Sequence, residues 1–156
     1  MRTSRFKAAA ATMLGLLTLA ACSTPRAKFA VQHYVPLARS VQPLGELHLS
    51  NTRMALSALE GEMKLQYVGL MPDAAGDALG GAQVYRVRNA SRFFRQNAGR
   101  NGYCAQTPLW VALNSKTGAP AWSKEIWVGL LTLPDWAKFT ADLDSYCAGG
   151  TYVRAP

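Results

Sequence analysis

Polar and apolar residues alternate in several short stretches of the chain, and this period of two predicts half-buried β-strands. Other short stretches are apolar throughout and predict strands as well. Together the predicted strands cover residues 46–50, 63–68, 83–88, 109–113, 125–133 and 151–153. Most of the chain beyond residue 45 is therefore expected to form β-structure.

Two stretches instead space their apolar residues as a helix does. Residues 89–96 begin with Asn89, a residue type that favours the N-cap of a helix. Residues 134–143 begin with Pro134, and proline favours the first position of a helix. These patterns predict an α+β fold, with a mainly antiparallel sheet of four to six strands and two short helices on one face.

The first 45 residues differ from the rest and divide the chain into three parts. Positive charges near the N-terminus precede an apolar run over residues 8–21, which is too short to cross a bilayer core of about 30 Å as a helix. This pattern is typical of a secretory signal peptide over residues 1–21. Residues 22–44 contain three prolines and predict a tether, and residues 45–156 predict a single globular domain.

The apolar run ends in Leu19-Ala20-Ala21-Cys22, which resembles the lipobox of bacterial lipoproteins. The resemblance implies that Cys22 carries a diacylglyceryl group and becomes the new N-terminus, so that a lipid attaches the protein to a membrane. Ser23 stands where an aspartate tends to retain lipoproteins at the inner membrane. The resemblance therefore implies an outer-membrane lipoprotein in the inner leaflet, facing the periplasm. The alternative is an ordinary signal peptide cleaved nearby, with Cys22 as a spare thiol.

Cys104 and Cys147 are the two cysteines that remain after Cys22. In an oxidising compartment an isolated pair of cysteines favours a disulfide. The alternative is a reactive Cys104 activated by a nearby histidine, and the chain has only His33 and His48 for that role. We expect the disulfide.

Composition offers little for catalysis. The chain has 2 His and 3 Cys among 156 residues, and it contains no Gly-x-Ser-x-Gly or His-Glu-x-x-His motif. Glu60 and Glu62 flank Gly61, which favours a turn over a catalytic pair. The sequence therefore predicts a protein that is not an enzyme, with no catalytic residue, no cofactor and no metal.

The net charge of +8 is concentrated in one part of the chain. Residues 78–124 contain no acidic residue but several arginines, and arginine binds carboxylates and phosphates through two parallel hydrogen bonds. In the helix predicted at 89–96, burial of the apolar side points Arg92 and Arg95 to solvent, with Arg88 just before it. These three arginines are the predicted binding site for a protein partner with an acidic surface. The alternative is a solvated basic face without a partner, and an exported lipoprotein is not expected to meet nucleic acid.

All four tryptophans, Trp110, Trp122, Trp127 and Trp136, fall within a short window. They could form a glycan-binding groove, but the apolar residues around them favour the core, with Trp122 as the exposed exception. Whether the window is core or groove stays open at this stage.

Two stretches resemble small uncharacterised lipoproteins of the bacterial envelope. One is the Cys-x₃-Pro-x-Trp-Val-x-Leu motif over residues 104–113, and the other is Tyr-Cys-x₃-Thr-Tyr-Val over residues 146–153. This resemblance implies no particular activity. The resulting hypothesis is a lipid-anchored periplasmic binding protein, an inhibitor or immunity-type protein acting on a cell-wall hydrolase. The alternative is a structural accessory lipoprotein of an outer-membrane or secretion complex.

Overall fold

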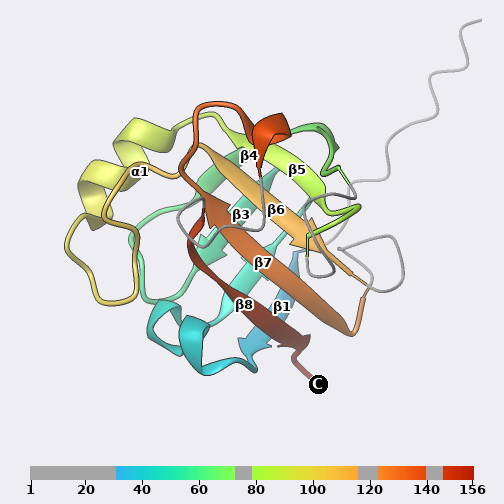
Figure 1. Ribbon diagram of the computed structural model, residues 1–156. Coiled ribbons are helices and arrows are strands. Elements are labelled where there is room, and N and C mark those ends of the chain that lie inside the picture. Colours follow the sequence, from blue (N-terminus) through green and yellow to red (C-terminus); the bar gives the residue numbers. More distant parts are fainter. Residues whose placement is uncertain (1–30, 73–78, 116–122, 140–145) are drawn as a thin grey trace, which may run out of the picture.

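The computed structural model describes residues 31–72, 79–115, 123–139 and 146–156. Eight antiparallel strands form a closed barrel in which each strand pairs with the next one along the chain (Figure 1). The strands are β1 (Gln32–Pro36), β2 (Leu47–Leu49), β3 (Arg53–Leu56), β4 (Met63–Leu70), β5 (Gln83–Val87), β6 (Trp110–Asn114), β7 (Glu125–Leu131) and β8 (Tyr146–Arg154). Pairing of β8 with β1 closes the barrel.

In the described part of the chain, three short helical segments lie in the connections between strands. The α-helix α1 (Ala90–Asn97) lies between β5 and β6, at the left-hand end of the barrel in Figure 1. The 3₁₀ segments η1 (Arg39–Leu44) and η4 (Trp136–Lys138) follow β1 and β7. Of the described helices, none is both long and apolar enough to span a membrane.

Alternate residues of the strands point inward and form the main core. On β7, for example, Ile126, Val128 and Leu130 belong to this cluster, and Tyr34 and Tyr152 within it are fully buried. An eight-stranded barrel is just wide enough for side chains to fill its interior. The inside of this barrel is therefore a packed core.

A second apolar cluster lies on the outer face of β5, β6 and β7. Val84, Ala112 and Leu131 come from these strands, and Phe139 from beyond η4 covers them. Trp110, Trp127 and Trp136 pack against the same cluster. These three tryptophans therefore contribute to apolar packing, as the interpretation of the window as core predicts. Trp122 lies outside the described residues.

The predicted α+β fold with four to six strands is wrong, because the chain forms a nearly all-β closed barrel of eight strands. Two strands, β1 and β3, were not predicted at all. The second predicted helix is only the 3₁₀ turn η4, where Asp135 accepts a hydrogen bond from the backbone N–H of Ala137 at 3.1 Å. Residues 140–143 of that prediction lie outside the described part of the chain.

The segment interpreted as a tether contributes to the barrel. Both β1 and η1 fall within residues 22–44, and Val41 and Leu44 of η1 are buried in the main core. The globular domain therefore begins before residue 45. The signal peptide and Cys22 lie outside the described residues.

The expected disulfide between Cys104 and Cys147 is present, with 5.0 Å between the two Cα atoms. It joins the connection that follows α1 to the start of β8. Cys104 is therefore bonded and is not available as a nucleophile.

Candidate docking groove

Helix α1 presents its arginines to solvent because its opposite side is buried. Ala90, Phe93 and Asn97 face the barrel, whereas Arg92 and Arg95 are exposed. The ring of Phe93 packs edge-to-face against Tyr103 at 6.0 Å between ring centroids. The predicted helix is thus present with the predicted orientation.

An asparagine at each end of α1 forms hydrogen bonds with β4 or with the connection that precedes it. At the start, the Asn89 side chain accepts a hydrogen bond from the Lys64 backbone N–H at 2.8 Å and donates one to the Glu62 carbonyl at 2.9 Å. At the end, the buried Asn97 side chain accepts from the Glu60 backbone N–H at 2.7 Å and donates to the Glu60 carbonyl at 3.1 Å. These bonds hold the arginines of α1 at a fixed place relative to β4.

Four arginines line one groove on this surface, and we call it the basic groove. Arg86 comes from the outer face of β5, Arg88 follows that strand, and Arg92 and Arg95 come from α1. The rest of the groove is lined by Val87, Asn89, Ala90, Ser91, Leu109, Trp110 and Pro134. The structure thus brings the three predicted arginines together and adds a fourth, Arg86, from a neighbouring strand.

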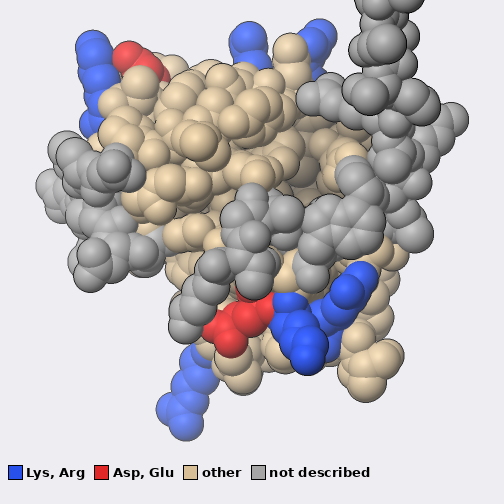
Figure 2. All heavy atoms as spheres, turned by 90° about the vertical axis from the view of Figure 1, so that its right-hand side faces the viewer, with Lys and Arg blue, Asp and Glu red and all other residues tan. Residues whose placement is uncertain are grey.

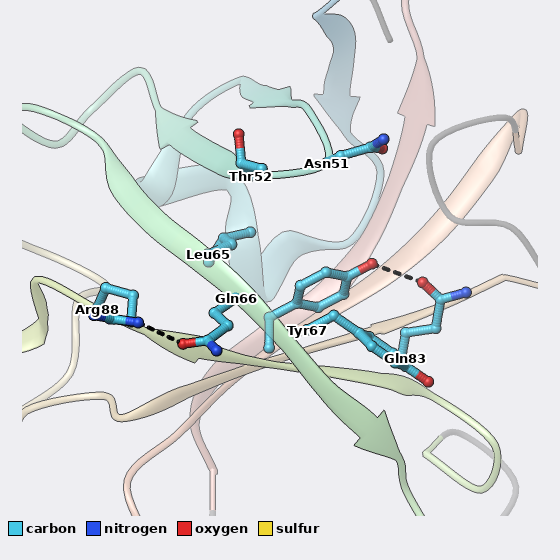
Figure 3. Close-up of a pocket in the computed structure, with 8 residues that line it drawn as sticks. Asn51, Thr52, Leu65, Gln66, Tyr67, Gln83 and Arg88 are labelled. Carbon is cyan, nitrogen blue, oxygen red and sulfur yellow. Dashed lines mark hydrogen bonds between the residues drawn. The ribbon is translucent and has the colours of Figure 1, made fainter. Parts of the chain in front are cut away.

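No acidic side chain neutralises the basic groove among the described residues. Four carboxylates there have other partners: Glu60 pairs with Arg100, Glu62 with Arg53 and Asp135 with Lys138, and Glu46 contacts the His33 ring. Arg88 donates a hydrogen bond at 2.7 Å to the neutral Gln66 side chain instead (Figure 3). The guanidinium groups therefore keep their charge available for an anionic partner.

The first turn of α1 adds to this positive potential. Since the Asn89 side chain bonds to β4, it does not cap the helix, and the first turn contains no acidic residue. The N–H groups at the start of a helix carry a partial positive charge. The start of α1 lines the same groove through Ala90 and Ser91.

A second hollow opens beside β4, where β3 is too short to cover it. β3 pairs with β4 only at Arg53 and Met54, so the later residues of β4 extend past it. Asn51, Thr52, Leu65, Gln66, Tyr67, Gln83, Tyr85 and Arg88 line this side opening (Figure 3). The Tyr85 hydroxyl donates to the Gln83 side chain at 2.7 Å. Arg88 lines both hollows and thus connects them.

Amide, hydroxyl, guanidinium and apolar side chains line the two hollows. In the described part of the chain, their linings contain no histidine, cysteine or carboxylate. Burial raises the pKa of Tyr103 and Tyr152, and it also raises that of Tyr34 against an opposing effect of Arg154. These phenols therefore stay neutral at physiological pH.

Positive charge is not spread evenly over the molecule. Figure 2 shows one end of the barrel with Lys and Arg side chains in small groups near its rim and uncharged surface over much of its centre.

Comparisons with protein-family models, with curated proteins and with solved structures found no match.

Proposed function

We propose that this protein is a lipid-anchored binding protein of the bacterial envelope that uses the basic groove to inhibit a cell-wall hydrolase. The observation that carries the proposal is the groove itself, with four arginines and no acidic partner among the described residues. Enzymes that cleave glycan chains hold a pair of carboxylates in an open cleft. Arginine pairs with a carboxylate through two parallel hydrogen bonds, so the groove and such a cleft are chemically complementary.

The closed barrel suits an inhibitor because it holds the arginines in place before binding. Helix α1 is fastened at both ends by Asn89 and Asn97. A rigid binding surface loses less conformational entropy on association than a flexible one. Inhibition by occupying a cleft then needs only the side chains of α1 and β5.

The position of the groove agrees with a membrane anchor at Cys22. Helix α1 follows the end of β5, whereas β1 begins at the opposite end of the barrel, beside the end of β8 (Figure 1). Val31 lies nine positions after Cys22, and an extended chain of that length spans about 30 Å. A lipid on Cys22 would therefore be tethered to the end of the barrel opposite α1, and this leaves the groove accessible to a partner in the periplasm.

We expect Arg92→Glu combined with Arg95→Glu to slow association with the hydrolase about tenfold or more at low salt. The difference should shrink as salt rises, because exposed charges are screened. The measurement is the association rate and the inhibition constant against purified lysozyme and a second purified cell-wall hydrolase. The matched control is Arg39→Glu with Lys124→Glu, which makes the same change in net charge at exposed sites outside the groove.

If the groove variant and the control slow association equally, only net charge matters and the groove is not the docking site. If the wild-type chain inhibits no hydrolase and instead co-purifies with a multi-subunit membrane complex, the structural accessory role replaces inhibition.

We also expect Cys22→Ser to abolish lipid attachment and release the protein from the membrane fraction. The reason is that only a thiol at the end of the Leu-Ala-Ala-Cys sequence can take the diacylglyceryl group. The measurement is incorporation of labelled palmitate, with Ser23→Ala as a control that should keep the label. Absence of label in the wild-type chain would contradict the anchor.

A further inference from the structure

The only two histidines of the chain, His33 and His48, lie side by side on the outer surface of the barrel. They occupy directly opposite positions on β1 and β2, and their rings stack with 4.7 Å between centroids and 4° between planes. Tyr34 and Leu47, their neighbours along the strands, are buried. Because side chains alternate along a strand, both imidazoles point outward.

A carboxylate completes this group. Glu46 precedes His48 by two positions, so its side chain emerges on the same face of the sheet. Its Oε2 atom lies 2.9 Å from Nε2 of His33. One ligand atom from each of the three residues can be chosen so that all lie within 4.8 Å of one another.

We propose that His33, Glu46 and His48 form a surface site for a borderline divalent cation such as Zn²⁺. Two imidazoles and one carboxylate are a known three-ligand set for zinc, which leaves a fourth position for water or for a group from a partner. Two ligand atoms on a tetrahedral zinc lie about 3.4 Å apart, given Zn–N distances of about 2.1 Å. The ligand atoms must therefore approach one another by about 1.4 Å, and the two stacked rings must tilt toward each other, before all three residues converge on one ion.

The surrounding structure supports such a site. Within the described part of the chain, the ring of His48 makes no hydrogen bond, and His33 bonds through its ring only to Glu46. Position 55 on β3, opposite His48, is an alanine, so no long side chain at that position competes for the space. The Glu46 backbone N–H is itself held by the Ser57 hydroxyl at 2.8 Å.

The backbone also fixes the spacing of the ligands. β1 is paired on both sides, with β2 and β8, and β2 is paired with β1 and β3. A closed barrel has no free edge at which these strands can shift in register.

Nitrogen ligands favour Cu²⁺, Ni²⁺ and Zn²⁺ over Mg²⁺ and Ca²⁺, which take oxygen ligands. The site is independent of the basic groove and of the function proposed for it.

The test is calorimetric titration of the full chain in detergent with Zn²⁺, and in parallel with Cu²⁺ and Mg²⁺. The chain carries Cys22→Ser and no polyhistidine tag, so that neither a free thiol nor a tag binds metal. We expect one Zn²⁺ per chain, tighter binding of Cu²⁺ and none of Mg²⁺. Bound Co²⁺ should give the strong visible absorption of a four-coordinate ion.

His33→Ala, His48→Ala and Glu46→Gln should each weaken Zn²⁺ binding at least about tenfold, because loss of an outer-shell partner alone weakens a site 10- to 100-fold. Glu62→Gln, which breaks the exposed pair of Glu62 with Arg53, should leave binding unchanged. Arg92→Glu with Arg95→Glu should also bind Zn²⁺ normally, which separates this site from the docking groove. Absence of stoichiometric binding, or equal binding by the His48→Ala chain, would overturn the proposal and leave a simple surface ion pair.

Discussion

Replacing Cys104 and Cys147 by alanine should lower the free energy of unfolding by about 2–4 kcal/mol. The disulfide joins residues 43 positions apart, and a cross-link of this span reduces the conformational entropy of the unfolded chain. Cys104 is also 2% exposed and belongs to the main core, so its loss removes packing as well.

Urea unfolding of the oxidised chain, the reduced chain and the alanine variant measures this effect. The oxidised chain should have the highest midpoint and the alanine variant the lowest, because the reduced chain keeps the Cys104 side chain in the core. Cys22→Ser is the control, because it removes a cysteine from outside the described barrel and should not change the midpoint. An unchanged midpoint on reduction would show that the bond contributes nothing to stability.

Phe93→Ala should destabilise the protein by about 3–5 kcal/mol, which is typical of deleting a buried aromatic ring. Phe93 is 1% exposed and is the largest side chain with which α1 packs against the barrel. Its loss leaves a cavity between the helix and the barrel. Since the same helix carries Arg92 and Arg95, the variant should also loosen the basic groove.

The matched control is Phe94→Ala, one position along the same helix, where the ring is only partly buried. We expect it to cost less than half as much free energy, measured by urea unfolding. Hydrogen exchange in α1 should rise in the Phe93 variant more than in the control. Equal effects of the two substitutions would mean that α1 is not held through Phe93.

The strands that could be predicted are those whose pattern is visible locally. Met63–Leu70 and Glu125–Leu131 are long enough for alternation or continuous apolar character to be recognised. By contrast, Arg53 is the only polar residue of β3, so its four residues show no clear alternation, and β1 ends in Pro36 within a segment rich in proline. Closure of the barrel depends on pairing between β1 and β8, which are distant in sequence, and no local pattern reports such a contact.

The candidate sites show the same limit. Arg88, Arg92 and Arg95 are close in sequence and lie on or next to one helix, so the helical spacing alone predicts that they lie together. Asn97 was missed as an anchor, because its partner Glu60 lies on another connection.

With only two histidines, the sequence predicts no metal site. They are 15 positions apart, and only the register of β1 on β2 brings them face to face. Glu46 joins them through the same register, whereas its separation of two positions from His48 was readable in the sequence.

The pairing of β1 with β8 also has a consequence for folding. The backbone N–H of Ala155, almost the last residue of the chain, donates to the carbonyl of His33 at 3.0 Å. Until residues 146–154 are available, β1 and β7 both remain open edges, and open edges readily pair with other chains. The unclosed barrel, with β1 and β7 as free edges, is therefore the form of the protein that pairs most readily with other chains.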